Sequence, residues 1–471
     1  MKLQFLFLAL LLFLNTQVSN AQHEMSSVKF TGRGIATSVA NDYEAIGINP
    51  ANLGWSGDNK KFHLTLFETG ASIWSDALQK KELVNDFWTG DVDFSQADKR
   101  IAADKFADHG MAINFDMTWL GLSFQSQRMG IALSIRDRLS GNFMQSQEFA
   151  EVMFLGYNAP YFDGTKTIEN GKIVGNRKSP KKYSEFLDGT RWQMNWYREY
   201  NLALGFSPIQ TDVLSLSIGA GAKYISGFGT FDFHSKNNEL VAYTALSPIF
   251  NIDYGTTQES QNPSNVTEEG LLPVGNGLGF DLGISAKFLD VITAGIAITD
   301  IGSINWNGNV YEVPDKVFDK YESDGFKSYN IFLEPQEINQ VSGKSDMIGI
   351  EDKNVALPTK LRFGASAALG TTFGGGFDIV APLNDAPANY GKPILGFGAW
   401  VRPVNLIEFS LGLVTGGDYS TMMPVGISLN LGNFWELGFA TRDIFTFVSE
   451  KTPVVSGSVF FLRFSLGTIE D

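Results

Sequence analysis

The chain of 471 residues contains no cysteine and only four histidines. The lack of cysteine excludes a disulfide framework and thiol chemistry. The histidines are His23, His63, His109 and His234, and no two of them have the spacing of a metal-binding pair. We interpret them as surface or loop residues, and we expect neither a metal site nor a cofactor.

Other signals of catalysis or cofactor binding are also weak. Asp91-Val92-Asp93 is acidic, but the glycine and glutamate of a helix-loop-helix calcium site do not follow it, which favours a solvated loop. Gly275 to Gly279 has alternate glycines, but it opens a predicted strand and not a helix, so a dinucleotide site is not supported. A nucleophile paired with a distant base cannot be recognised from sequence. We expect no enzymatic activity.

Positive charge is scarce, and so are long apolar runs. Lys and Arg number 36 against 51 Asp and Glu, giving a net charge of −15, which argues against nucleic acid as a partner. The longest apolar run, Phe5 to Leu14, is too short for a membrane helix, which needs roughly 20 residues. With Lys2 before it and Ser19-Asn20-Ala21 after it, the run predicts a signal peptide cleaved near Ala21. The chain is therefore expected to be exported and not to cross a membrane as helices.

Alternation of apolar with small or polar residues recurs along the rest of the chain. Trp435, Leu437 and Phe439, for example, alternate with smaller or charged neighbours. Side chains of a strand point alternately to its two faces, so each such block predicts a strand with one apolar and one polar face. Fourteen blocks have this pattern: 61–68, 111–126, 129–138, 191–207, 212–231, 276–288, 291–303, 357–370, 373–381, 392–402, 405–415, 421–431, 434–445 and 456–467.

The connections between blocks alternate in length. Every second junction is a short turn, such as Gln127-Arg128 or Gly432-Asn433, whereas the intervening junctions include the long segments 69–110, 139–190, 232–275 and 304–356. Short turns at one rim and long loops at the other are typical of outer-membrane barrels. We therefore predict an all-β, 14-stranded antiparallel transmembrane β-barrel in the outer membrane of a Gram-negative cell. A secreted β-sandwich or propeller is the alternative fold.

Parity assigns the two faces of the barrel. Lipid-facing residues include Phe280, Leu282, Phe397 and Phe409, and the residues between them are mostly small. Since a charge facing lipid costs a few kcal/mol, charged residues of inward parity are placed in the lumen. These are Arg136, Lys223, Asp281, Lys287, Arg362, Asp378, Arg402, Glu408, Glu436, Arg442 and Arg463. They either pair with each other and with a plug, or line a path for an amphipathic solute.

The long loops contain their own structural signals. Helices are expected from the N-cap residue Ser75 to Trp88 and from Ser95 to His109. Asn-Gly hairpin tips are expected at Asn170-Gly171 and Asn307-Gly308. Trp192, Trp196 and Tyr200 have outward parity near the long-loop rim, where interfacial aromatic residues belong. A folded extracellular cap is therefore predicted.

Residues 22–60 precede the first block and lack its alternation. Apolar residues such as Tyr43, Ile46 and Trp55 would be unusual in a solvated periplasmic tail, so a plug within the lumen is favoured. The segment contains Asn49-Pro50-Ala51, in which proline fixes φ and the preceding asparagine can cap a rigid turn.

This plug motif, with the fourteen blocks, resembles the FadL-type long-chain fatty acid transporter superfamily, whose members carry Asn-Pro-Ala in an N-terminal hatch. The matching positions are Asn49, Pro50 and Ala51. The loops do not match, so no ligand-contacting residue can be carried over, and the chain looks closer to the divergent branch that includes type IX secretion shuttle-like proteins. The resemblance implies a signal peptide at 1–21, a hatch at 22–60 and a barrel at 61–471.

Two functions follow from this resemblance. The first is passive uptake or export of a hydrophobic or amphipathic small molecule, with no cofactor. The second is a plugged barrel that acts as a binding or scaffold component of the cell envelope or of a type IX-like secretion system. The expected partners are outer-membrane lipid together with such a small molecule or a secretion-machinery or surface protein.

Overall fold

The computed structural model describes residues 27–88, 93–252, 254, 256–330, 347–387, 389, 391–417 and 419–469. The expected signal peptide, the first residues of the hatch and most of Asp91-Val92-Asp93 lie outside these ranges. Within them, no helix combines the length and apolar character that a membrane-crossing helix requires.

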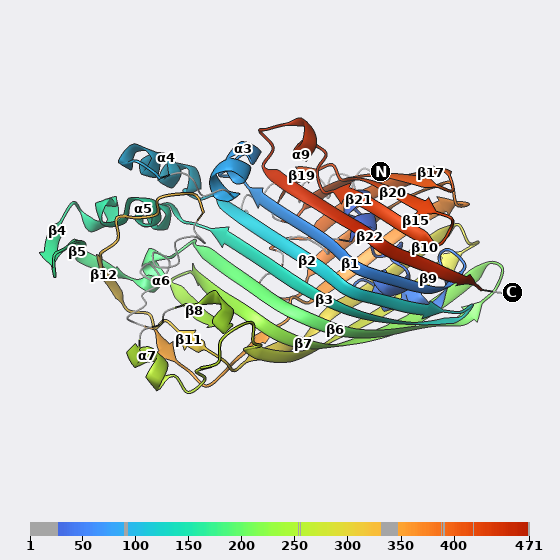
Figure 1. Ribbon diagram of the computed structural model, residues 1–471, viewed down its shortest axis with the longest axis horizontal. Helices are drawn as coiled ribbons and strands as arrows, with labels where there is room; N and C mark the ends of the chain where they lie inside the picture. Colours follow the sequence, from blue (N-terminus) through green and yellow to red (C-terminus); the bar gives the residue numbers. More distant parts are fainter. Residues whose placement is uncertain are drawn as a thin grey trace, which may run out of the picture.

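Fourteen antiparallel strands form a closed barrel, as predicted (Figure 1). Each pairs with its neighbours in sequence, and the last strand pairs with the first from Lys60↔Thr468 to Trp74↔Val454. The barrel strands are β1 (Lys60–Ser75), β2 (Gly110–Gln125), β3 (Met129–Met144), β6 (Arg191–Gln210), β7 (Leu214–Lys236), β9 (Gly275–Phe288), β10 (Ile292–Trp306), β15 (Lys360–Leu369), β16 (Phe373–Pro382), β17 (Ile394–Val404), β18 (Ile407–Gly416), β20 (Val425–Leu431), β21 (Trp435–Thr441) and β22 (Val454–Thr468).

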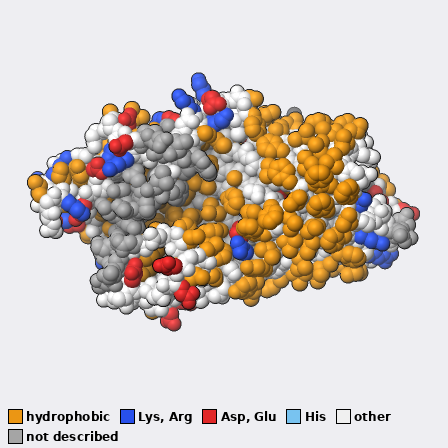
Figure 2. Space-filling model, viewed as in Figure 1, with side chains coloured by type: hydrophobic (Ala, Val, Ile, Leu, Met, Phe, Trp, Pro, Cys, Tyr) orange, Lys and Arg blue, Asp and Glu red, His pale blue; other side chains and the backbone are white. Residues whose placement is uncertain are grey.

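The two faces of the wall follow the predicted parity. On β9, the outward side chains of Phe280, Leu282 and Ile284 are about half exposed, whereas those of Asp281 and Ser285, which have the opposite parity, are buried. Figure 2 shows the result as a broad hydrophobic surface over the barrel, with charged side chains gathered toward the two ends of the molecule. A closed barrel with such a belt satisfies all strand hydrogen bonds internally and matches the apolar interior of a bilayer.

The two rims differ as the loop lengths predicted. The turn between β20 and β21 contains Gly432 and Asn433, both with left-handed φ, as a type I′ hairpin requires. This rim also holds the start of β1 and the end of β22, which are paired there. The opposite rim has all the long loops, and they extend well beyond the barrel (Figure 1).

The long loops fold into a cap with its own apolar core. It contains α4 (Gln96–Phe106), α5 (Gln147–Leu155), α6 (Tyr183–Phe186) and a small sheet of β4 (Lys166–Glu169), β5 (Lys172–Lys182) and β12 (Val317–Tyr321). Phe154, Phe162, Phe186, Phe318 and Phe326 are buried together at its centre. Edge-on and tilted ring contacts join them, including Phe186 and Phe318 with ring centroids 4.6 Å apart. The cap is therefore an ordered structure with a defined shape.

Two of the expected local signals in the loops are confirmed. Ser95 caps α4, and its side chain and that of Asp98 form a reciprocal capping box. Asn170 and Gly171 both have left-handed φ at the turn of the β4–β5 hairpin.

One further loop expectation is confirmed in part, and another is wrong. The helix expected in the first long loop is present as α3 (Lys80–Glu82) and η3 (Leu83–Trp88), but it is capped by Gln79, and Ser75 is instead the last residue of β1. Asn307-Gly308 is not a hairpin tip, because the strand after it, β11 (Val310–Glu312), pairs with β8 (Glu239–Leu246) and β13 (Ile348–Gly349) instead of with β10.

Alternation alone does not predict the surroundings of every strand residue. Trp192 of β6 keeps the parity of Trp196 and Tyr200, because β6 pairs with β3 without a register shift, but at its long-loop end it is buried in the cap core against Phe143 and Phe149. On β22, a register shift against β21 places Phe460 in the lumen and Phe461 toward lipid. One inserted residue reverses the facing of all that follow it. Parity therefore fails on one side of this bulge.

Candidate functional site

The segment before β1 lies inside the barrel and forms a plug. It comprises α2 (Val28–Arg33), η1 (Asp42–Ala45) and η2 (Pro50–Gly54), joined by short buried turns (Figure 1). These three elements contact different parts of the wall: α2 packs on β17, β18 and β20–β22, η1 on β2 and β3, and η2 on β3, β6, β7 and β9. The plug thus reaches both sides of the lumen.

Asn49, Pro50 and Ala51 form the turn that begins η2. The Asn49 side chain accepts a hydrogen bond from the backbone N–H of Ala51 at 3.2 Å. Pro50 occupies the first helical position, where the N–H that proline lacks would have no partner within the helix. The Asn49 amide also donates to the Ser285 hydroxyl of β9 at 2.8 Å. The motif therefore shapes the turn and also fastens it to the wall.

Glycines of the wall let this turn approach closely. A Cβ on Gly219 of β7 would lie 2.3 Å from the backbone nitrogen of Ala51, and one on Gly283 of β9 would lie 2.0 Å from the Asn49 side-chain oxygen. Similar contacts surround α2, where a Cβ on Gly398 of β17 would lie 2.0 Å from the Arg33 carbonyl. The small inward residues of the barrel thus accommodate the plug backbone.

A carboxylate of the wall holds the segment between α2 and η1. Asp378 of β16 accepts hydrogen bonds from the backbone N–H groups of Ala36 and Thr37 at 2.5 and 2.7 Å. Arg362, on the neighbouring strand β15, is fully buried, and its Nε donates to the Thr299 hydroxyl at 3.3 Å. Charge-assisted bonds of this kind are stronger than neutral ones, so Asp378 is a principal anchor of the plug.

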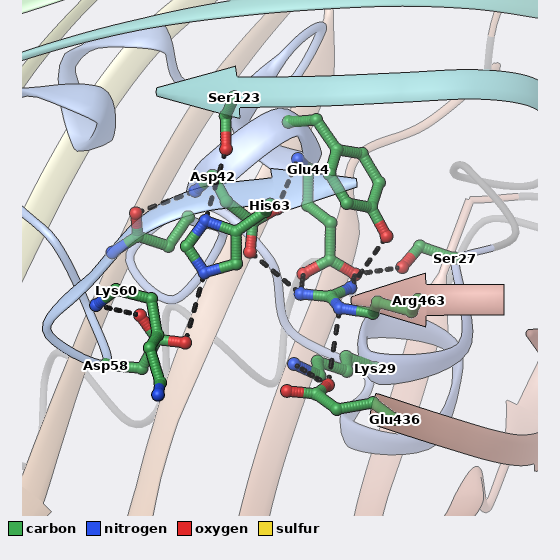
Figure 3. Close-up of polar contacts among 12 residues, drawn as sticks. Ser27, Lys29, Asp42, Glu44, Asp58, Lys60, His63, Ser123, Glu436 and Arg463 are labelled. Atoms are coloured by element: carbon green, nitrogen blue, oxygen red, sulfur yellow. Dashed lines mark hydrogen bonds and ion pairs between the residues drawn. The ribbon is translucent and has the colours of Figure 1, made fainter. Parts of the chain in front are cut away.

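Arg463 of β22 joins the plug to the opposite wall (Figure 3). Its guanidinium contacts the carboxylates of Asp42 and Glu44 at 2.8 Å each and that of Glu436 at 3.3 Å. The Arg463 side chain is only 2% exposed, so these are buried ion pairs. Glu436 also pairs with Lys29 of α2 at 3.1 Å.

Two further residues predicted to line the lumen, Glu408 and Arg402, form a bridge around α2. Glu408 of β18 pairs with Arg33 at 2.5 Å and with Arg402 at 2.7 Å. Arg33 also lies over the ring of Trp400, with its guanidinium carbon 4.6 Å from the ring centroid. Arg402 is one-third exposed, so this bridge extends toward solvent at the short-turn rim.

A histidine lies beside the Arg463 cluster at the mouth of the barrel. His63 of β1 contacts the Asp58 carboxylate through Nε2 at 3.1 Å and the Ser123 hydroxyl through Nδ1 at 3.3 Å (Figure 3). Burial raises the pKa of Asp58, but the hydrogen bond and charge of His63 outweigh it and hold that pKa below its usual range. Asp58 lies in the link between plug and wall, so this contact closes the turn into β1.

The other charged residues predicted to line the lumen lie farther from the plug. Arg136 pairs with Glu199 at 2.6 Å, and Lys223 pairs with Asp281 and Asp300 at 3.1 and 2.6 Å. Arg138 connects the two groups by contacting Glu199 at 3.3 Å and Asp300 at 3.6 Å. This layer has nearly balanced charge, which favours mutual pairing over a path of free charges.

Lys287 and Arg442 belong to neither cluster. Lys287 lies near the short-turn rim with its Nζ 5.0 Å from the centre of the Trp55 ring. Arg442 follows β21 at the long-loop rim, where its backbone N–H donates to the Ser456 hydroxyl. The predicted lumen residues therefore occupy several layers of one lumen and do not converge on a single centre.

Sequence reasoning missed several partners in these clusters. Asp42, Glu44 and Arg33 belong to the plug, whose concentration of charged residues in a short apolar segment could have marked them. Asp300 was missed because the register of β10 shifts beside it, between Ile298 and Ile301, and its own φ is +59°. No pattern in the sequence identifies Glu199 as the partner of Arg136.

A small apolar cavity lies between the plug and the wall. Its volume is about 70 Å³. The plug contributes its lining from α2 to Ala36, and the wall contributes mainly aliphatic side chains, with Asp378 and Arg442 as its charged members. The lining residues are Phe30, Thr31, Gly34, Ile35, Ala36, Asp378, Val380, Ile394, Gly396, Val414, Gly416, Met422, Pro424 and Arg442.

Potential metal ligands are not grouped in the parts of the chain that the structure describes: no three His, Asp or Glu residues there are arranged to hold an ion. Ser123, His63 and Asp58 resemble a catalytic triad in composition. However, Ser123 and His63 are each only 2% exposed, and neither lines the cavity. Their arrangement fits a structural contact.

Comparison with known proteins places the chain in a family. Residues 57–435 match the model described as a family of unknown function, DUF5723. The chain belongs to the DUF5723 family. The matched range begins just after the plug and covers most of the barrel and cap. No curated protein sequence matches this DUF5723 chain significantly.

Several solved structures are similar to this DUF5723 protein over nearly the whole of its length. The toluene transporter TbuX of Ralstonia pickettii is 13% identical, with 94% of this chain and 98% of that chain covered and a TM-score of 0.47. The toluene transporter TodX of Pseudomonas putida is 11% identical, with 96% and 99% covered and a TM-score of 0.44. A FadL homologue of Pseudomonas aeruginosa is 11% identical, with 95% and 99% covered and a TM-score of 0.43.

Proposed function

We propose that this barrel is an outer-membrane channel through which a hydrophobic or amphipathic small molecule passes passively. The observation that carries the proposal is the apolar cavity between the plug and strands β16 to β18. Its lining is mainly aliphatic, with the ring of Phe30, and includes few polar side chains, among them Thr31, Asp378 and Arg442. Such a lining favours an apolar ligand over an ion or a sugar.

The size of the cavity indicates how passage would occur. An apolar cavity of about 150 Å³ is large enough to hold benzene. At about 70 Å³, this one cannot accept even a single aromatic ring without movement of its lining. Because the plug provides one side of the lining, displacement of the segment from Phe30 to Ala36 is the simplest way to enlarge it.

The lumen charges fit the same proposal in a supporting role. Asp378, Glu408, Glu436 and Arg463 each contact the plug, whereas Arg136, Lys223 and Asp281 pair within the wall. We infer that the first group sets the closed position of the plug and the second group maintains the shape of the lumen. Neither group is required to bind the passing molecule.

Narrowing the cavity tests the proposal. Val414 of β18 lines the cavity, whereas the adjacent Leu413 points to lipid and is 42% exposed. Uptake of radiolabelled toluene and of a radiolabelled fatty acid is measured in vesicles containing the full chain. Val414→Phe is expected to reduce uptake several-fold, and Leu413→Phe, which adds the same bulk outside, is expected to leave it unchanged. Uptake no greater than that of empty vesicles, for the unaltered chain and both probes, would rule out the channel.

A scaffold role is the second candidate function. The cap favours it, because its core and small sheet give the long-loop side a fixed shape of the kind that a protein partner can recognise. This role predicts that substitutions in the cavity have no effect, while loss of the β4–β5 hairpin weakens binding of a surface or secretion-machinery protein. Affinity purification from detergent-solubilised outer membrane, with and without residues 166–182, distinguishes the two.

A further inference from the structure

The loop between β21 and β22 presents three apolar side chains to the outside. Its short helix, α9 (Phe445–Val448), lies at the long-loop end of these strands (Figure 1). Phe445, Phe447 and Val448 are 47, 57 and 70% exposed, whereas Thr446 between them points inward and is 6% exposed. Exposing two phenylalanines and a valine to water is unfavourable unless another apolar phase covers them.

The wall beneath this loop is short. β20 and β21 have seven residues each, whereas a strand needs about 9–11 residues to cross the hydrocarbon layer. Pro424 precedes β20 and separates it from the four-residue strand β19 (Tyr419–Met422). The regular wall therefore ends below the level that the neighbouring strands reach.

The apolar loop continues the lipid-facing surface of the barrel. The ring of Phe447 lies 5.7 Å from the ring of Phe439, centre to centre. Phe439 is an outward residue of β21 and is itself 39% exposed on the apolar belt. The two rings thus join α9 to the apolar belt of the barrel.

The loop is held in place by several hydrogen bonds. Asp443 accepts from the backbone N–H of Met423 at 3.3 Å and from the Thr452 hydroxyl at 3.2 Å. Thr446 donates to the Val454 carbonyl at 3.1 Å. Beyond α9, Glu450 pairs with Lys80 at 3.0 Å, and Lys451 is exposed. The apolar side chains are therefore presented in a fixed orientation below a group of charged residues.

We propose that Phe445, Phe447 and Val448 insert into the outer leaflet and contact lipid acyl chains, completing the belt where β20 and β21 are too short. The fixed orientation, the short strands and the contact with Phe439 all favour lipid as the occupant. The charged residues beyond α9 then lie at the level of the lipid head groups. This inference depends on the barrel fold alone and not on the proposed transport.

Site-specific labelling tests the proposal cleanly, because the chain has no cysteine. Phe447→Cys and Val448→Cys are each labelled with an environment-sensitive fluorophore in the full-length protein. The labelled proteins are reconstituted in phosphatidylcholine–phosphatidylglycerol vesicles that contain lipids with a nitroxide on the head group or on an upper acyl carbon. Leu282→Cys serves as the lipid-facing control, and Ile168→Cys, 78% exposed on β4 of the cap, serves as the aqueous control.

Labels at 447 and 448 are expected to be quenched by the acyl-chain nitroxide at least half as strongly as the label at 282, and several-fold more than the label at 168. Quenching at 447 and 448 that equals the value at 168 would overturn the proposal and point to water or a protein as the occupant. Only protein that migrates as the folded barrel before heating is measured. If Phe447→Cys does not fold, the quenching measured for Val448→Cys, at the more exposed position, decides between the two outcomes.

Discussion

The side-chain amide of Asn49 donates a hydrogen bond to the Ser285 hydroxyl at 2.8 Å and so fastens the plug turn to β9. Ser285 in turn donates to the Asn52 side chain at 2.5 Å, three residues along the same turn. Asn49, Ser285 and Asn52 are all almost completely buried. Because the asparagine caps the turn and also binds the wall, the local motif and the position of the plug depend on each other.

Replacing Asn49 should therefore loosen the plug. Asn49→Ala removes the cap of η2 and the contact with Ser285, and loss of a helix cap alone costs about 0.5–2 kcal/mol. We expect faster proteolysis within residues 27–58 while the barrel stays folded. Ser285→Ala, which keeps the cap, should have a smaller effect. Equal proteolysis of Asn49→Ala and the unaltered protein would show that the motif does not hold the plug.

Two glycines on the inner face of β7 offer a matched comparison. A Cβ on Gly219 would lie 2.3 Å from the Ala51 nitrogen, whereas one on Gly221 would have no neighbour closer than 3.4 Å. Gly219→Ala must displace plug backbone, and overpacking of this kind costs about 1–3 kcal/mol. The temperature at which the folded barrel band disappears should fall for Gly219→Ala and stay unchanged for Gly221→Ala. The same shift in both variants would mean that plug contact is not the cause.

The buried ion pairs of Arg463 should contribute far more to the free energy of unfolding than the partly exposed pair of Arg402. Arg463→Met leaves three carboxylates, Asp42, Glu44 and Glu436, without their shared partner, and breaking a buried pair costs about 3–5 kcal/mol. Arg402→Met removes a pair that is one-third exposed, for which about 0–1 kcal/mol is expected. Denaturant unfolding in detergent micelles measures both. Comparable losses in the two variants would contradict the assigned role of Arg463.

The barrel could be predicted from sequence because two strong physical constraints act on every strand. Lipid requires apolar residues at alternate positions, and the lumen admits small or charged ones. Strand positions, faces and loop lengths can therefore all be predicted from short stretches of sequence. Phe280, Asp281 and Leu282 face as expected for this reason. Where a bulge interrupts the alternation, as between Phe460 and Arg463, the local rule fails.

The plug and its partners were less accessible to such reasoning. The Asn49-Pro50-Ala51 motif indicated a turn, but its wall partner, Ser285, is 236 residues away. The pairing of Arg463 with Asp42 spans more than 400 residues. Parity placed Arg463, Glu408 and Asp378 inside, yet only the closed barrel shows which of the lumen charges contact the plug and which pair with each other.

The proposal that the plug moves to let a molecule pass can be tested with a reversible lock. The Thr31 and Ser458 hydroxyl oxygens are 3.2 Å apart and join α2 to β22, so Thr31→Cys with Ser458→Cys places two thiols close enough to form a disulfide. Thr441→Cys with Ser456→Cys is the matched control, because those oxygens are 3.0 Å apart and both belong to the wall.

Uptake of radiolabelled toluene and fatty acid into vesicles, measured before and after reduction, is the most direct measurement. Oxidised Thr31→Cys/Ser458→Cys protein should lose most of its uptake and recover it on reduction, while the wall–wall pair should conduct equally in both states. Undiminished uptake through the oxidised plug–wall pair would contradict a moving plug.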